Sequence, residues 1–157
     1  EGSHTAGNSP GVNDGAGAIV VSSDEWAQAN GHEPLAEVVA HAQSANDYAY
    51  LATTPASAAI KALEKAGLQP GDIDLWEINE AFASVTLNSI NALGIDEEKV
   101  NVLGGAVALG HPIGASGARI VGTLVHELRR RGGGLGCAAI CSGGGQGDAI
   151  IVRVNAA

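Results

Sequence analysis

Short apolar runs of strand length alternate along this chain with stretches whose apolar residues recur at helical spacing. Alternation of this kind is typical of α/β folds, in which helices cover a sheet. Two strand-like runs close the chain around a short glycine-rich connection, so we expect a mixed sheet. The predicted strands are residues 18–22, 35–41, 73–78, 136–141 and 149–154. The predicted helices are residues 24–29, 55–66, 81–93, and one from 116 to the arginines at 129–131.

Composition narrows the class of protein further. The 157 residues suit one domain, and 45% of them are apolar, but only 3% are aromatic and none is methionine. The core must therefore be built from Ala, Val, Ile and Leu. A net charge of -9 argues against a nucleic-acid surface, which needs clustered Lys and Arg. No run is long and apolar enough to span a membrane, and the first residues resemble no targeting peptide.

Two cysteines, Cys137 and Cys141, lie four residues apart in an apolar run. In a strand, such side chains point the same way without joining, and secreted disulfide frameworks use more cysteines. We therefore expect both thiols to be reduced, in the cytoplasm or an organelle matrix. Cys137 lies inside a predicted strand, where packing in the core is the expected role.

The segment GGAVALGHPIGASGAR, residues 104–119, places a histidine and a proline among glycines. It is not a phosphate-binding loop, which needs Lys and Ser or Thr after its second glycine, and its spacing does not fit a dinucleotide fingerprint. His111 instead lies in a strand-to-helix loop, where the N–H groups of a helix N-terminus favour negative charge. A lone loop histidine is most often structural, but the glycines leave room for a substrate beside this one.

A second glycine-rich segment, CSGGGQG at residues 141–147, follows a buried strand. A cysteine at the end of a strand, beside three glycines, exposes a thiol next to bare backbone N–H groups. Those are the parts of a thiolate centre with an oxyanion hole. A tight turn preceded by a core cysteine is the alternative.

Two other segments carry polar residues where α/β folds bind ligands. In WEINEAFA, residues 76–83, Asn79 and Glu80 follow a predicted strand, and either could instead cap the next helix. In TAGNSPGVNDGAGA, residues 5–18, the asparagines and the aspartate are turn formers. A plain loop is the alternative to substrate contact there.

Together, these four segments resemble the C-terminal half of a thiolase, a coenzyme A-dependent acyltransferase. They occur in the family's order and span nearly the whole chain, and the histidine and cysteine blocks are very specific to that family. The resemblance implies that residues 1–157 form a thiolase C-terminal domain. It also implies a layered α/β fold with a five-stranded mixed sheet covered by helices, packed against a similar N-terminal half.

The resemblance also implies chemistry. Thiolases condense two acyl-CoA molecules, or cleave a 3-ketoacyl-CoA with free CoA, and a nucleophilic cysteine carries the acyl group. His111 matches the histidine that activates this nucleophile and helps hold the thioester oxygen. Cys141 matches the acid/base cysteine, which deprotonates acetyl-CoA in condensation and protonates the carbanion in cleavage. Asn79 matches the asparagine that positions a water in one oxyanion hole, and the Gly143 N–H matches part of the other.

Substrate contacts are implied at Ser9, Gly110, Pro112 and Gly144. The family often has a serine that contacts pantetheine where Pro10 stands here, and Ser9 is offset by one position, so this loop departs from the pattern. CoA and acyl-CoA are expected as substrates, with no tightly bound cofactor and no metal.

The family's nucleophilic cysteine lies in its N-terminal half, and neither cysteine here has the required context. We therefore expect a fragment or one half of a split protein, inactive until the N-terminal half is supplied. An apolar partner-facing surface also implies a homo-oligomer. One alternative is a non-catalytic thiolase-like module that binds acyl-CoA, lipid or a protein. Another is a self-contained hydrolase with Cys141 as nucleophile and His111 as base.

Overall fold

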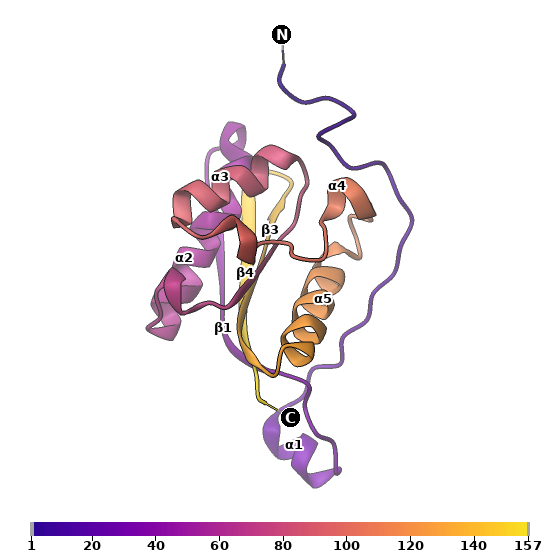
Figure 1. The fold of residues 1–157 in the computed structure, drawn as a ribbon, viewed down its shortest axis with the longest axis vertical. Coiled ribbons are helices and arrows are strands. Elements are labelled where there is room, and N and C mark those ends of the chain that lie inside the picture. Colours follow the sequence, from indigo (N-terminus) through magenta and orange to yellow (C-terminus); the bar gives the residue numbers. More distant parts are fainter. Residues whose placement is uncertain (1, 157) are drawn as a thin grey trace.

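The centre of the molecule is a four-stranded mixed sheet in the order β1-β4-β3-β2, in a computed structural model that describes residues 2–156 (Figure 1). Strands β1 and β3 are antiparallel to β4, whereas β2 is parallel to β3. The strands are β1 (Glu37–Ala45), β2 (Leu75–Ile78), β3 (Gly134–Ser142) and β4 (Gln146–Val154). The helices are α1 (Asp24–Ala29), α2 (Thr54–Ala66), α3 (Ala83–Leu93), α4 (Ala106–Leu109) and α5 (Ser116–Arg130). Short 3-10 turns lie at Tyr48–Thr53, Pro70–Asp72 and Glu97–Lys99.

Helices cover both faces of this sheet, with α2 and α3 on one side and α5 on the other (Figure 1). On the α2 side, a row of buried alanines packs against Trp76 and Ile151. On the α5 side, an aliphatic stripe that includes Leu124 packs against Leu75 and Val152. Neighbouring residues of one strand thus serve opposite layers, as the two-residue period of a strand requires. The small-residue core predicted from composition is confirmed.

The prediction of a fifth strand at residues 18–22 is wrong. This segment is extended but has no strand beside it, and Val20 is 91% exposed. It runs along α5 rather than along an edge of the sheet (Figure 1). Just before it, Gly17 lies so close to this helix that a Cβ there would lie 2.9 Å from the Ala118 side chain. A strand requires a hydrogen-bonded neighbour, and apolar β-branched residues alone do not supply one. Beyond β2, the sheet continues only as one isolated bridge between Trp76 and Val100 in the described residues.

Most helix boundaries follow the sequence signals. The Ser23 side chain caps α1 by accepting the N–H of Trp26 at 3.2 Å, and Gly67 ends α2 in the left-handed conformation. The helix predicted at residues 81–93 begins two residues later than expected and is buried on one side only. In α3, Val85 and Ser89 are fully buried but Leu87 is 57% exposed, because only one side of the helix packs against the domain.

The N-terminal segment, residues 2–22, lies outside the layers and runs past α4 and α5 (Figure 1). Its first turn is closed by Asn8, whose side-chain oxygen accepts the N–H of Thr5 at 2.7 Å. The carbonyl of Asn8 accepts the N–H of Ala83, the first residue of α3, at 3.0 Å. Residues 5–18 form neither helix nor strand, and this loop supplies a partner to one of the N–H groups that the start of α3 leaves free.

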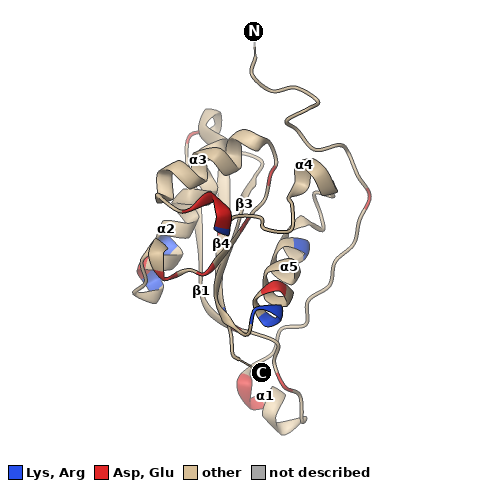
Figure 2. Cartoon of the chain, in the orientation of Figure 1, with Lys and Arg blue, Asp and Glu red and all other residues tan. Residues whose placement is uncertain are grey.

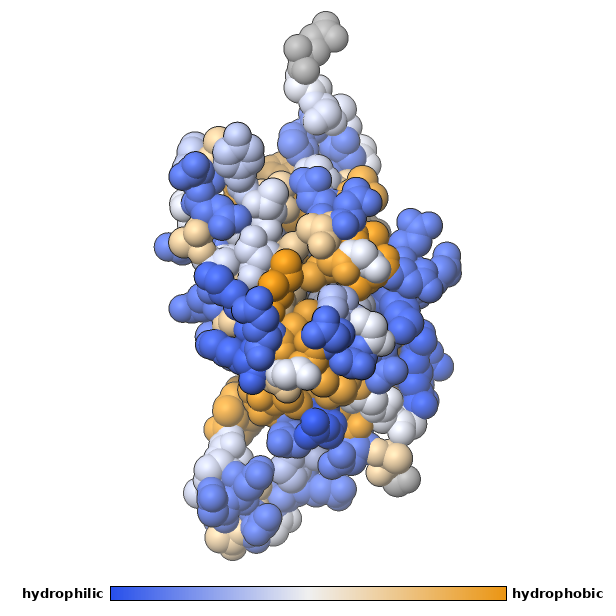
Figure 3. All heavy atoms as spheres, turned by 90° about the vertical axis from the view of Figure 1, so that its left-hand side faces the viewer, coloured by the Kyte–Doolittle hydropathy of each residue, from blue (hydrophilic) through white to orange (hydrophobic). Residues whose placement is uncertain are grey.

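Charged residues are grouped away from the middle of the sheet. Figure 2 shows the basic residues mainly on α2 and at the ends of α5. At the C-terminal end of α5, Glu127 pairs with Arg130 at 2.6 Å and with Arg131 at 2.7 Å, and these guanidinium groups lower its pKa to about 2. The predicted arginine-rich helix end is confirmed. On the side facing left in Figure 1, hydrophilic side chains surround an apolar area of the surface (Figure 3).

Candidate active site

The carboxyl ends of β2 and β3 bring Asn79 and Cys141 to the same edge of the sheet. The two strands are parallel and in register, with Ile78 opposite Ala139. The N–H of Asn79 donates to the carbonyl of Ala139 at 2.9 Å, which continues this pairing past the end of β2. Cys141 lies two residues further along β3. In α/β folds, ligands bind where such strand ends meet.

The loop between α4 and α5 carries His111 to this edge. Helix α4 ends at Gly110, whose φ of 103° lies in the region that favours glycine. The carbonyl of Pro112 accepts the N–H groups of Ala115 and Ser116 at 2.8 and 2.9 Å, and these bonds begin α5. His111 is therefore held between two helices, half-buried, with its ring against the end of β2.

Four contacts of neighbouring side chains assign the tautomer of His111. The Oδ1 of Asn79 faces the Arg119 guanidinium at 3.5 Å, so its Nδ2 donates toward Nε2 of His111 at 3.4 Å. Ser116 donates its single hydroxyl hydrogen to the carbonyl of Pro112 at 3.1 Å and accepts from Nδ1 of His111 at 2.6 Å. The neutral ring therefore carries its proton on Nδ1 and a lone pair on Nε2. A lone pair facing the strand ends is what a general base requires.

The glycine before His111 accommodates a protein side chain. A Cβ on Gly110 would lie 2.6 Å from Cγ of Asn13, which comes from the N-terminal segment. The Oδ1 of Asn13 accepts the N–H of His111 at 3.2 Å. The expected empty space beside the imidazole is therefore filled by Asn13 at this position, while Cβ atoms on Gly114 and Gly117 would meet nothing within 4 Å.

Glu80 holds the start of α4, the helix that leads into the loop of His111. Its carboxylate accepts the N–H of Val107 at 2.9 Å and the side-chain N–H of Asn101 at 3.0 Å. A Cβ on Gly105 would overlap this carboxylate, so only glycine fits there. Sequence reasoning allowed Glu80 or Asn79 to cap α3, but Glu80 caps α4 and Asn79 faces His111.

The charges of Glu77 and Arg119, which lie next to each other, dominate the electrostatics around Asn79. Glu77 is 3% exposed and its Oε2 lies 3.3 Å from Arg119. Burial raises the pKa of Glu77 to about 7, although Arg119 acts in the opposite direction. Burial, and then the positive charge of Arg119, lower the pKa of His111 below its usual value of 6.5. His111 is therefore neutral at pH 7 and can accept a proton.

The two cysteines have different environments, and both are free thiols. Cys137 is fully buried in the core, as predicted, and burial raises its pKa to about 12. Cys141 is 8% exposed, and burial raises its pKa while its backbone hydrogen bond acts to lower it. The sequence-based expectation that neighbouring groups lower this pKa is not met. Cys141 is thus a protonated thiol at neutral pH, and within residues 2–156 no hydrogen bond joins it to His111.

The other predicted site residues lie in three separate parts of the chain. Gly143 and Gly144 are exposed at the tip of the β3–β4 turn, directly after Cys141 and Ser142. Pro112 packs against Gly15, where a Cβ would lie 2.7 Å from the proline ring. Ser9 lies in the N-terminal segment, half-buried, in a shallow hollow that it shares with Pro10.

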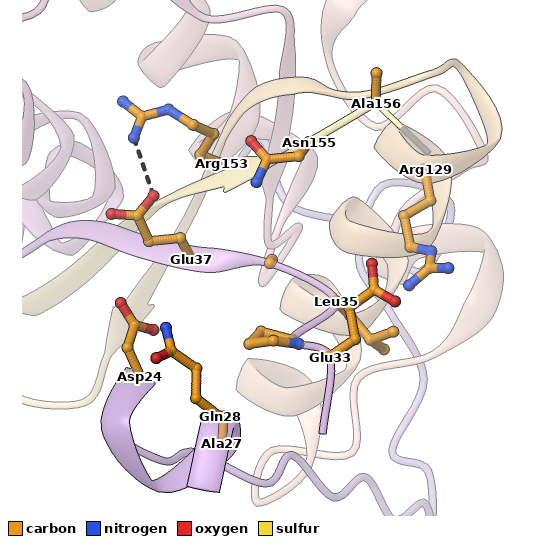
Figure 4. Close-up of a pocket in the computed structure, with 12 residues that line it drawn as sticks. Asp24, Ala27, Gln28, Glu33, Leu35, Glu37, Arg129, Arg153, Asn155 and Ala156 are labelled. Atoms are coloured by element: carbon orange, nitrogen blue, oxygen red, sulfur yellow. Dashed lines mark hydrogen bonds and ion pairs between the residues drawn. The ribbon is translucent and has the colours of Figure 1, made fainter. Parts of the chain in front are cut away.

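A second hollow, of about 360 Å³, lies at the opposite end of the sheet (Figure 4). Its walls come from α1, the start of β1 and the end of β4, and it contains the ion pair of Glu37 with Arg153 at 3.0 Å. None of the strand-end residues described above lines it.

Sequence reasoning missed four residues that shape the site. Ser116 and Arg119 belong to the histidine block, and their spacing of three residues predicts that they share one face of the first turns of α5. Glu77 alternates with Asn79 on β2 and therefore points to the same side of the strand. Asn13 carried no local signal, because its contact with His111 spans 98 residues.

Comparisons with known proteins identify the family of this chain. Residues 32–154 match the family described as "Thiolase, C-terminal domain". The chain belongs to the thiolase family. The match begins at residue 32, shortly after the end of α1, and residues 1–31 lie outside it. Across residues 2–156, no helix has both the length and the apolar character needed to cross a membrane.

The relatives of this thiolase domain are acyltransferases. The chain is 49% identical over 153 residues to the acetyl-CoA acetyltransferase of Allochromatium vinosum and 52% identical over 155 residues to that of Escherichia coli. Each alignment covers 98% of this chain but only 39% of the relative. The crystal structure of human mitochondrial 3-ketoacyl-CoA thiolase in complex with CoA superposes with a TM-score of 0.94 at 48% identity, over 97% of this chain and 39% of that one.

Proposed function

We propose that this chain is the C-terminal catalytic part of an acyl-CoA thiolase, acting with an N-terminal half that supplies the nucleophilic cysteine. The observation that carries this proposal is the placement of Asn79 between His111 and Arg119, at the strand ends that also hold Cys141. The chain spans about 39% of the length of the curated relatives it matches, which leaves room for that half.

His111 activates the nucleophile. Its Nε2 lone pair accepts the proton of the cysteine thiol of the N-terminal half, and the thiolate attacks the ketone carbon of a 3-ketoacyl-CoA. Ser116 accepts from Nδ1 before and after this transfer, so the imidazolium keeps its hydrogen bond. The N–H now on Nε2 then donates a hydrogen bond to the substrate oxygen on which negative charge develops, and this oxyanion re-forms a carbonyl when the C–C bond breaks.

Cys141 completes the cleavage as an acid. The bond between the α-carbon and the ketone carbon breaks, the electron pair stays on the acetyl-CoA fragment, and the Cys141 thiol gives that carbanion its proton. A thiol whose pKa is raised by burial is protonated at neutral pH, which suits this step. In condensation the same thiol must first lose its proton, so this direction needs a base or a higher pH.

Two N–H donors that bind the developing oxyanions complete the proposed site. The Nδ2 of Asn79 lies at the strand edge and positions a water that holds one oxyanion, and the N–H of Gly143 holds the other. Each such donor is worth about 3–4 kcal/mol when the charge forms. Gly110, Pro112, Gly144 and Ser9 are proposed as contacts of CoA or acyl-CoA, which are substrates rather than bound cofactors. We also propose that the assembled enzyme is a homo-oligomer.

The test is a chimera in which this chain replaces the matching C-terminal 39% of the E. coli acetyl-CoA acetyltransferase. We expect the chimera to thiolyse acetoacetyl-CoA and the H111A variant to lose this activity. Full activity of a folded H111A chimera would contradict the role given to His111. Turnover by this chain alone would instead support the self-contained hydrolase, which needs a thiolate that the buried Cys141 does not favour.

A further inference from the structure

Arg119 lies behind the proposed site and touches none of the atoms that would react. It projects from the first turns of α5 toward β2, where it meets Glu77 at 3.3 Å and the Oδ1 of Asn79 at 3.5 Å. Its Nε is buried and has no hydrogen-bond partner among the described residues. Two of its neighbours, Glu77 and Asn79, are almost completely buried, and Arg119 contacts both of them.

The lengths of these contacts show how Arg119 acts. Charge-assisted hydrogen bonds are usually about 2.7–2.9 Å long, so contacts of 3.3 and 3.5 Å are weak as hydrogen bonds. The charge of the guanidinium still orients the amide of Asn79, because the carbonyl end of that dipole turns toward a cation. The N–H₂ end is then left facing Nε2 of His111.

We propose that Arg119 is a positioning residue whose positive charge turns the Asn79 amide so that Nδ2 faces His111, which favours the tautomer with its lone pair on Nε2. This inference rests on the proposed function only for its effect on catalysis. Other ionisable groups near this end of the sheet include Glu77 behind Arg119, Glu80 on the loop between β2 and α3, and Cys141 on β3.

Two substitutions separate this role from a structural one. R119Q removes the charge and breaks the ion pair with Glu77, whereas E77Q breaks the same ion pair and leaves the charge in place. If Arg119 only stabilises the fold, the two variants behave alike. If its charge acts on His111, R119Q raises the pKa of His111 toward its usual value, and E77Q does not. R119K keeps the charge and is expected to restore the lowered pKa.

The measurement is an NMR titration of the histidine rings in this chain, with His126 and His32 as internal references. The ¹⁵N shifts of His111 report its tautomer, and we expect Nδ1–H in the unmodified chain and in E77Q but a mixture in R119Q. R119Q leaves Glu77 without its partner and could fail to fold. In that case the double variant R119Q/E77Q, which replaces both charged groups with amides, is used instead, and the same rise in the pKa of His111 is expected. An unchanged pKa of His111 in R119Q, or an equal rise in E77Q, would overturn the proposal.

A kinetic arm in the E. coli chimera links the inference to catalysis. We expect R119Q to lower kcat about 10–100-fold with little change in KM, since a misoriented Asn79 affects the reacting geometry more than binding. R119K should recover part of this loss. If the pKa of His111 rises in R119Q but the unmodified chimera shows no thiolysis, the proposed function is wrong and the present inference still holds. Normal thiolysis in folded R119Q would overturn the inference alone.

Discussion

The hydroxyl oxygen of Ser116 lies 2.6 Å from Nδ1 of His111, five residues further along the chain and in the first turn of α5. This contact is the shortest that the imidazole makes, and it ties the ring to the start of a helix whose stripe of aliphatic residues is buried against the sheet. The orientation of the proposed base is therefore fixed by a helix that packs into the core of the domain, and not by the loop alone.

Replacing Ser116 with Ala removes this tie. We expect kcat for thiolysis in the chimera to fall about 10-fold or more, because the imidazolium loses the acceptor of its Nδ1–H. The S116T variant keeps the hydroxyl and serves as the matched control. Steady-state kinetics of the two variants check the prediction, and wild-type kcat in a folded S116A chimera would be inconsistent with it.

Replacing Gly110 with Ala tests the close approach of the N-terminal segment. The residue has a φ of 103°, and its new Cβ would lie 2.6 Å from Asn13. We expect a loss of about 1–3 kcal/mol in the free energy of unfolding. G114A is the matched control, because a Cβ there would meet nothing within 4 Å. Denaturant unfolding of both variants decides the matter, and equal stabilities would show that the N-terminal segment does not pack there.

The buried carboxyl of Glu77 predicts how stability depends on pH. Burial raises its pKa from the usual 4.5 to about 7 in the folded chain, so the folded state holds the proton more tightly. The contribution of Glu77 to stability is then fully present below pH 4.5 and is lost as the pH rises to 7. The loss amounts to at most about 3 kcal/mol.

Unfolding free energies at pH 5 and pH 8, for the unmodified chain and for E77Q, isolate this contribution from other titrating groups. We expect the unmodified chain to lose more stability between the two pH values than E77Q does. A steeper decline in E77Q would mean that Arg119 keeps the Glu77 carboxylate ionised at pH 5.

The two thiols predict different reactivities. Cys141 lies at the end of a strand next to an exposed glycine turn, whereas Cys137 has no exposed surface and a pKa of about 12. In the native chain, iodoacetamide should modify Cys141 first, and Cys137 only after unfolding. Mass spectrometry of the modified peptides measures the order. If Cys137 were modified before Cys141, the register of β3 described above would be wrong.

Sequence patterns predicted the layered fold because the helix caps, the aliphatic stripe of α5 and the two closing strands are local signals. The segment 18–22 misled the prediction, since an apolar β-branched run looks the same whether or not a neighbouring strand exists. The site was predicted in part for a similar reason. His111, Asn79 and Cys141 stand in recognisable blocks, but the contact of Asn13 with His111 depends on how distant segments pack.

The central claim is that His111 and Cys141 act together at one site, and a double-mutant cycle in the chimera tests it most directly. The rates of acetoacetyl-CoA thiolysis would be compared for H111A, C141A and the double variant, with C137A as a control for the loss of a buried thiol. We predict that each single variant loses activity by about 100-fold or more and that the double variant is little worse than the more severe single one. Wild-type rates in either folded single variant, or losses that simply multiply in the double variant, would contradict the claim.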